Sequence, residues 1–164
     1  MPTKCILHTL RDTQHTQTVT NHSLDLNYME ITDKTITEIA EYFECGEVCF
    51  YNTETAEIEH YPTEIDLFGD EPDPWQDVKD KIDLNIGVYR KCEPMESNQS
   101  FKVMESFIPK VENPELREKL SEILLRNKPF RNFKFVIDDS GEYRQLWFDH
   151  RFEENKAWVK KQLS

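Results

Sequence analysis

The stretch KPFRNFKFVI, residues 128–137, interleaves aromatic and basic side chains. Its apolar residues recur at helical spacing, which predicts a short amphipathic helix that buries Phe130, Phe133 and Ile137. Arg131 and Lys134 are then expected to face solvent. Amphipathic helical patterns also precede and follow this stretch, and together they predict a C-terminal helical bundle.

The helices around this stretch are marked by their expected ends. Ser97 or Asn98 is expected to cap the first of them. Residues 113–115, Asn-Pro-Glu, begin the next helix with a capping side chain, a proline at the first helical position and an acid favoured by the helix dipole. Residues 138–141, Asp-Asp-Ser-Gly, interrupt the pattern, and a long final helix follows with His150 on its apolar stripe.

The N-terminal part predicts a helix followed by a β-hairpin. Thr32 or Asp33 is expected to cap the helix, and Gly46 is placed to end it in a left-handed conformation. Apolar strands at 48–51 and 56–61 then flank a loop of about four residues, which is typical of a hairpin.

A lone hairpin is only marginally stable, so we expect the face that carries Phe50 and Ile58 to pack on helices. The acidic, proline-containing segment 62–74 is expected to be a connecting loop. The segment 75–91 then predicts a short helix followed by a strand at residues 86–89.

Together these patterns predict an α+β, mainly α fold, in which an N-terminal helix and a β-hairpin pack on a C-terminal helical bundle. Residues 1–28 lack an apolar period and are expected to be a flexible N-terminal leader. Residues 29–164 are expected to form a single α+β domain. Within it, 29–96 hold the helix, hairpin and acidic linker, and 97–164 form the helical part.

Charge is unevenly placed along the chain. The net charge is −12, yet residues 1–100 hold 7 Lys/Arg against 21 Asp/Glu, whereas residues 101–164 hold 13 against 11. Within 117–134 there are six bases and two acids. The pattern indicates either a mixed helical surface on an acidic protein or a basic patch set apart from the acidic half.

The basic residues of the C-terminal part form a candidate interaction surface: Arg117, Arg126, Lys128, Arg131, Lys134 and Arg144. One interpretation is a surface for an unidentified protein partner or for self-association. The alternative is a nucleic-acid-associated protein that binds phosphates through residues 117–134. The net charge disfavours nucleic acid, because it repels a polyanion at long range.

No motif in the sequence specifies a reaction, a cofactor or a metal. A Gly-rich phosphate loop, a nucleophile elbow and a His-Glu-x-x-His helix are all missing. Cys45-x-x-x-Cys49 lacks the two-residue spacer of a zinc knuckle. Asp149 and His150 point about 100° apart on a helix, so they do not easily orient each other for acid–base catalysis. We therefore expect no catalytic residues, no cofactor and no metal site, unless a pocket sets His60 or His150 beside a carboxylate.

Several segments taken together resemble a known family. They are Phe101-x-x-Met104-Glu105-Ser106-Phe107-Ile108, Glu115-Leu116-Arg117-x-x-Leu120, Lys128-Pro129-Phe130-Arg131-x-Phe133-Lys134 and Trp147-Phe148. Over roughly residues 30–163 the chain is similar to the bacterial uncharacterised protein family 0158. The resemblance implies a helix, a hairpin with a Thr-Glu-Thr-like turn, an acidic linker and an aromatic–basic run, and it implies no activity. Residues 138–142 depart from the proline-containing stretch of the family, so the turn there is expected to differ.

The sequence as a whole predicts a non-enzymatic bacterial protein that acts as a protein–protein interaction or regulatory module. A cytoplasmic location is expected, because the sequence shows neither a signal peptide nor a run of apolar residues long enough to span a membrane.

Overall fold

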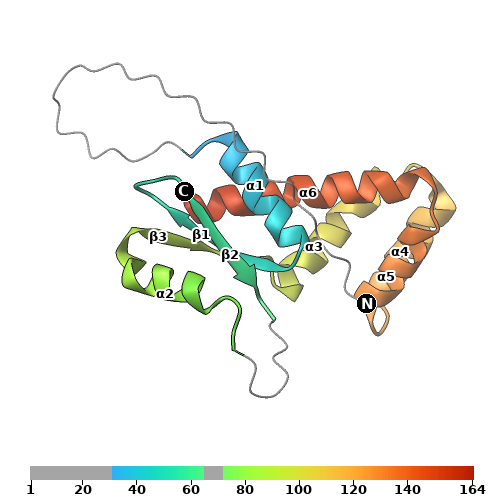
Figure 1. Ribbon diagram of the computed structural model, residues 1–164. Helices are drawn as coiled ribbons and strands as arrows, with labels where there is room; N and C mark the ends of the chain where they lie inside the picture. Colours follow the sequence, from blue (N-terminus) through green and yellow to red (C-terminus); the bar gives the residue numbers. More distant parts are fainter. Residues whose placement is uncertain (1–30, 65–71) are drawn as a thin grey trace, which may run out of the picture.

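The computed structural model describes residues 31–64 and 72–164, so the expected leader at 1–28 lies outside the described residues. The described chain forms a three-stranded antiparallel sheet and a larger set of α-helices. The expected α+β, mainly α class is therefore confirmed. In Figure 1 the sheet lies on one side of the molecule and the pair of helices α4 (Pro114–Leu124) and α5 (Pro129–Asp138) on the other. The long helix α6 (Glu142–Leu163) runs between them.

Helix α1, Asp33–Glu44, begins and ends where its local chemistry requires. The Thr32 hydroxyl accepts a hydrogen bond from the Thr35 amide at 3.1 Å, so Thr32 is the cap. Gly46 follows the last turn with a φ of +75°, as expected for a residue that ends a helix in the left-handed region.

Strand β1, Glu47–Asn52, is the centre of the sheet. It pairs with β2, Ile58–Pro62, on one side and with β3, Tyr89–Cys92, on the other, antiparallel in both cases. The Asn52 side-chain oxygen accepts hydrogen bonds from the Glu54 and Thr55 amides at 2.9 and 3.0 Å, which holds the hairpin turn. The predicted hairpin is confirmed.

The expected common face of Phe50 and Ile58 is wrong. Tyr51 pairs with Ile58 and Phe50 pairs with Glu59. Paired residues share a face of a sheet and successive residues alternate between faces, so Phe50 and Ile58 lie on opposite sides. Ile58 packs in the cluster that α1 and α6 form on one side, whereas Phe50 packs with α2 (Gln76–Leu84) on the other.

The strand expected at residues 86–89 begins three residues later. Helix α2, Gln76–Leu84, is followed by a 3-10 turn at Ile86–Val88, and only then by β3. Pairing across the sheet decides this boundary, because β3 exists only where it lies against β1. Ile86 is apolar but 62% exposed, and it lies before the paired residues.

The helical part contains α3, Ser97–Phe107, α4, Pro114–Leu124, and α5, Pro129–Asp138. The Asn113 side chain accepts a hydrogen bond from the Leu116 amide at 3.0 Å, which confirms the predicted start of α4. The expected cap of α3 is wrong. Ser97 is already the first helical residue, and Glu96 precedes it without a side-chain capping bond.

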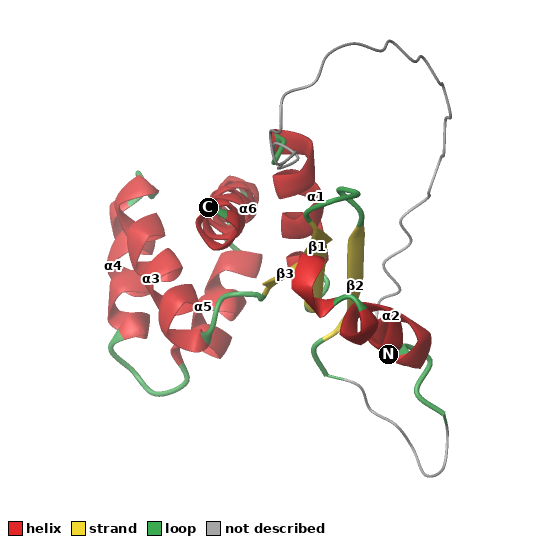
Figure 2. Cartoon of the chain, turned by 90° about the vertical axis from the view of Figure 1, so that its left-hand side faces the viewer, coloured by secondary structure: helices red, strands yellow, loops and turns green. Residues whose placement is uncertain are grey.

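Helix α6, Glu142–Leu163, contributes to two cores. Trp147 in its first half packs in the helical core with α3, α4 and α5. Val159 and Leu163 in its second half pack against α1 and the sheet. Figure 2 shows α6 between α1 on one side and α3, α4 and α5 on the other. The two cores are thus joined through one rigid helix.

None of the helices in the described residues has both the length and the apolar character needed to cross a membrane.

Candidate interaction site

A pocket opens between α3, α5 and α6 beside the helical core, and we call it the α3–α6 pocket. Its volume is about 320 Å³. It is lined by Met95, by Ser100, Val103 and Met104 of α3, by Phe130, Phe133, Lys134 and Asp138 of α5, and by Trp147, Phe148, Arg151 and Asn155 of α6. The stretch 128–137 therefore supplies most of the α5 wall of this pocket.

The rings of Phe133 and Trp147 form the base of the pocket, and Phe107, which does not line it, packs against both. The Trp147 ring centroid lies 4.8 Å from that of Phe133 and 5.3 Å from that of Phe107, edge to face in both cases. These three side chains are buried, as the helical spacing predicted for Phe133. Edge-to-face pairs at these separations stabilise a rigid arrangement. The base of the pocket is therefore preformed.

Phe130 is not buried, so the expectation for this residue is wrong. Its side chain is 42% exposed and its ring lies 6.4 Å from that of Phe101, at the mouth of the pocket. Because α5 begins at Pro129, Phe130 occupies the first turn, at the edge of the core. The helical spacing identified the correct side of α5 but not where along the helix the core ends.

Charged side chains stand at the rim of the pocket. Lys134 binds Asp138 one turn later on α5 at 2.8 Å, and its side chain is still 74% exposed. Asp138 also forms an ion pair with Arg144, whose Nε lies 3.5 Å from Asp138 Oδ1. The hydrogen bond from Lys134 is the main reason that the pKa of Asp138 lies below its ordinary value. Asp138 therefore stays ionised.

Arg151 stands where the α3–α6 pocket meets a second hollow. Its guanidinium lies 5.3 Å above the Phe148 ring and pairs with Glu44 of α1. Its Nε atom is buried without a hydrogen-bond partner in the described structure. The second hollow, about 180 Å³, shares Met95, Ser100, Arg151 and Asn155 with the first and extends to Phe43 of α1. The two hollows thus adjoin each other at these four residues.

The six predicted surface residues separate into three places. Lys134 and Arg144 meet at Asp138, and Arg144 also lies 4.7 Å above the Phe148 ring. Arg117 donates its Nε hydrogen to the Val111 carbonyl at 2.7 Å, near the start of α4.

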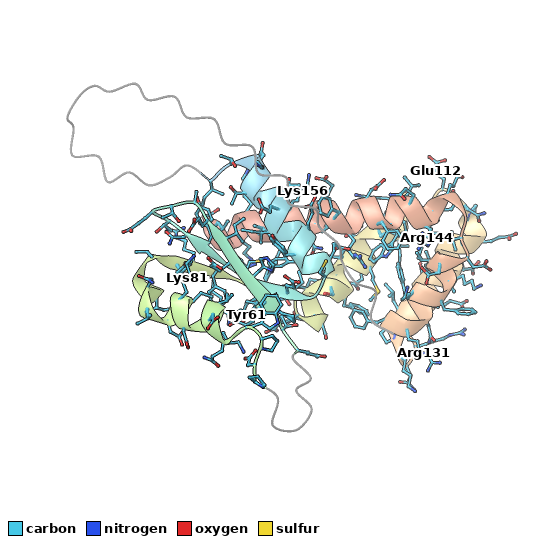
Figure 3. The ribbon with its side chains drawn as sticks, viewed as in Figure 1. Tyr61, Lys81, Glu112, Arg131, Arg144 and Lys156 are labelled. Carbon is cyan, nitrogen blue, oxygen red and sulfur yellow. The ribbon has the colours of Figure 1, made fainter. Side chains whose placement is uncertain are left out.

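Arg126, Lys128 and Arg131 lie together around the turn between α4 and α5, and all three are exposed. Arg126 binds Glu122 at 2.8 Å. Within residues 31–64 and 72–164, no carboxylate pairs with Lys128 or Arg131. Figure 3 shows Arg131 directed away from the rest of the protein. The predicted residues therefore do not form one continuous basic face.

His150 is buried, at 6% exposure, and its partners are not the neighbouring Asp149. Its Nδ1 lies 2.8 Å from Lys110 Nζ, and its Nε2 lies 2.9 Å from Ser106 Oγ. A lysine ammonium can only donate, so Nδ1 accepts and Nε2 carries the proton. A protonated Nε2 cannot take the hydroxyl proton of Ser106. This Ser–His contact is consequently not that of an activated nucleophile.

We expect His150 to make the protein less stable in mild acid. Burial, and then the charge of Lys110, hold the pKa of His150 below its ordinary value of 6.5. As the pH falls below about 6.5, the unfolded chain takes up a proton that the folded protein does not, so the free energy of unfolding falls. Urea unfolding between about pH 7.5 and about pH 5.5 should give a smaller decrease for His150→Asn than for the unchanged protein. Equal decreases in the two proteins would contradict this origin.

Cys49 and Cys92 are free thiols that lie opposite each other on β1 and β3. Burial raises the pKa of Cys92 to about 12, and it also raises the pKa of Cys49. Both therefore stay protonated and are poor nucleophiles. Across the residues that the structure describes, no three His, Cys, Asp or Glu side chains are grouped so as to hold a metal ion.

Sequence reasoning identified the α5 wall of the pocket and missed the α6 wall. Trp147, Arg151 and Asn155 are spaced by four residues, so they share one stripe of α6. This four-residue spacing is the feature of the sequence that points to the α6 wall, because it places a cation and an amide on the same side of the helix as a core tryptophan. Met95 carries no comparable signal, since it lies between elements and reaches the pocket only through the fold.

Comparison with known proteins agrees with the resemblance noted in the sequence. The profile of the uncharacterised protein family UPF0158 matches residues 57–164, which include β2, α2, β3 and α3 to α6. A UPF0158 protein from Pseudomonas aeruginosa is 30% identical over 67 residues, which cover 41% of this chain and 44% of that protein. The aligned segment thus spans less than half of this curated relative. No solved structure matches the chain significantly. Since the family profile covers more than half of its length, the chain belongs to the UPF0158 family.

Proposed function

We propose that this protein is a non-enzymatic interaction module whose α3–α6 pocket binds a short segment of a partner protein. The observation that carries the proposal is a partly open pocket with an aromatic base and a charged rim. Its volume of about 320 Å³ equals that of about ten water molecules in the liquid. An apolar side chain that displaces such water from aromatic walls gains the hydrophobic contribution typical of an interface anchor.

The rim indicates what should accompany the apolar side chain. Two cations, Lys134 and Arg151, and one carboxylate, Asp138, line the pocket. Lys134 is largely exposed, and its ammonium can donate a hydrogen bond to a second acceptor in addition to Asp138. We therefore expect the bound segment to carry an aspartate or glutamate next to its aromatic or aliphatic anchor. This charge pattern favours an acidic peptide over a basic one.

Catalysis has less support at this pocket. General acid–base chemistry needs a titrating group within hydrogen-bond reach of a substrate. His150 faces Lys110 and Ser106 and does not line the pocket. Asp138, the carboxylate of the rim, is held ionised by its cations. An anchored peptide uses the shape and the charge of the pocket without needing either group to transfer a proton.

Binding to nucleic acid is also less well supported. It needs several cations on one exposed face to neutralise phosphates. The six candidate cations are divided among three places, and Arg126 and Arg144 are each held by a carboxylate. We further propose that the protein is bacterial and cytoplasmic. The Pseudomonas aeruginosa source of its relative supports a bacterial origin.

Selection from a displayed library of random peptides tests the proposal. Enriched peptides are expected to pair an aromatic or aliphatic residue with a neighbouring acid. Their affinity, measured by fluorescence polarisation, should fall about tenfold in Phe130→Ala, which removes one wall of the pocket mouth. It should fall about tenfold in Lys134→Glu, because reversal of the rim charge repels the peptide acid.

Phe135→Ala is the matched control for this experiment. Phe135 lies on the same helix and is 78% exposed, but it does not line the pocket. Affinity should therefore be unchanged in this variant. Peptides that bind all three variants equally well, or a selection that enriches nothing, would reject the pocket as a peptide site.

A further inference from the structure

The α4–α5 turn forms a tip that is both apolar and basic. Leu125 is 89% exposed, and Arg126, Lys128 and Arg131 are exposed around it. We call these four residues the basic tip. The backbone accounts for their projection: Lys128 adopts a left-handed φ of +58°, and Pro129 then starts α5, so the chain reverses within a few residues. Single exposed apolar residues are ordinary. Here the exposed leucine stands among three cations, of which Arg126 is held by Glu122, whereas Lys128 and Arg131 are not paired with a carboxylate of the described residues.

The end of α2 forms a patch of opposite charge. Leu84 is 84% exposed and Ile86 is 62% exposed, and the exposed carboxylates of Asp80 and Asp83 lie on the same helix end. We call these four residues the acidic end. Lys81, the base among them, is already bound by Glu59 and lies 3.7 Å from Glu57. It therefore contributes little free positive charge to this patch.

A hollow beside the acidic end has room for an apolar side chain. Its volume is about 230 Å³, and Ile82, Asp83 and Ile86 form the side nearest to the end of α2. Lys79 and Lys91 also line it, and each is already bound by a carboxylate, that of Asp73 and of Glu93 respectively. Phe50 and Tyr61 of the sheet form its apolar floor, with their rings stacked 5.4 Å apart. Leu125 of a basic tip is an apolar group of suitable size for this hollow. The cations beside Leu125 would then face Asp80 and Asp83.

The two patches lie at opposite ends of the molecule. Figure 1 places α2 on one side and the α4–α5 turn on the other, and Figure 2 separates them in the same way. In Figure 3, Lys81 of α2 and Arg131 of α5 lie on opposite sides of the protein. The basic tip of one chain therefore cannot reach its own acidic end, and a complementary contact needs a second copy.

We propose that copies of this protein associate head to tail, with the basic tip of one copy bound to the acidic end of the next. Such a contact joins two different surfaces, so every dimer still has one free tip and one free acidic end. Association of this kind continues into longer assemblies unless the rotation closes a ring. The net charge of −12 opposes close approach of copies, so we expect a weak contact, with a Kd of about 0.1–1 mM. The inference does not use the α3–α6 pocket and goes beyond the proposed function.

Two charge-reversed proteins test this inference sharply. The tip variant combines Leu125→Asp with Arg131→Glu, and the end variant combines Leu84→Lys with Asp83→Lys. All four residues are exposed, so both variants should fold normally, which circular dichroism checks. Sedimentation at protein concentrations up to about 1 mM should show the average mass of the unchanged protein rising past that of a dimer. Each variant alone should stay monomeric.

Mixing the two variants gives the decisive result. The tip variant keeps a working acidic end and the end variant keeps a working tip, so an equimolar mixture should associate although each variant alone does not. A control with Leu146→Asp and Lys160→Glu makes the same chemical changes on exposed residues of α6 and should associate like the unchanged protein. The proposal is wrong if the unchanged protein stays monomeric, if either variant alone still associates, or if the mixture stays monomeric. Peptide binding in the pocket should survive in the tip variant, so the two proposals fail or succeed separately.

Discussion

Replacing Phe133 with alanine is expected to lower the free energy of unfolding by about 3–5 kcal/mol. Phe133 is 1% exposed, and its ring lies 4.8 Å from that of Trp147 and 6.4 Å from that of Phe107. Truncation removes the buried ring and both edge-to-face contacts. The cavity left behind joins the base of the α3–α6 pocket, where the rigid walls leave little room for collapse. Urea unfolding followed by circular dichroism measures this loss.

Phe135→Ala is the control for Phe133→Ala. It removes the same ring two residues further along α5, where the side chain is 78% exposed. Its effect should stay within about 0.5 kcal/mol, as for most surface substitutions. Similar losses in the two variants would mean that α5 does not pack with the face that we describe.

Replacing Ile39 with alanine is expected to cost about 2–5 kcal/mol, in the other core of the protein. Ile39 is fully buried on α1, in the cluster that includes Val159 and Leu163 of α6. Because α6 also carries Trp147 in the helical core, loosening one end of this helix should weaken both cores together. We therefore expect one cooperative transition at a lower urea concentration, seen equally by circular dichroism and by tryptophan fluorescence.

Glu41→Ala is the matched control on the same helix. Glu41 is exposed, so its loss should change the free energy of unfolding by no more than about 0.5 kcal/mol. If Ile39→Ala instead produced two separate unfolding transitions, the two cores would be independent. That result would contradict the role of α6 as a shared element.

The candidate site was only partly predictable from the sequence. Phe133 and Lys134 were singled out correctly, one as a buried ring and one as an exposed cation, because helical spacing alone separates the two sides of α5. Arg151 was missed as a pocket residue, because its role depends on Glu44, which is 107 residues away in the chain. The charge pattern identified basic residues but did not show which of them are held by acids. That requires the positions of Glu122 and Asp138 on the folded surface.

The errors in the fold have the same origin. The apolar character of Phe50 and Ile58 predicts a common face, but the strand pairing places them on opposite faces. Residues 86–89 were expected to form a strand because Ile86 and Val88 are apolar. The strand begins where hydrogen bonding to β1 begins, and the apolar Ile86 lies outside it. In each case the local pattern identified apolar residues correctly but carried no information about the strand with which they pair.

By itself, the sequence determined the features whose causes lie within a few residues of each other. Thr32 and Asn113 cap their helices through bonds to amides three residues later, and Gly46 takes a left-handed conformation that side chains disfavour. Only the tertiary structure decided which elements meet. It placed β3 against β1, joined two cores through α6, opened a pocket between α3, α5 and α6, and set the basic tip and the acidic end on opposite sides. The physical reason is that these arrangements depend on contacts between residues far apart in the chain, such as Arg90 with the Leu163 carbonyl, and no local pattern encodes those contacts.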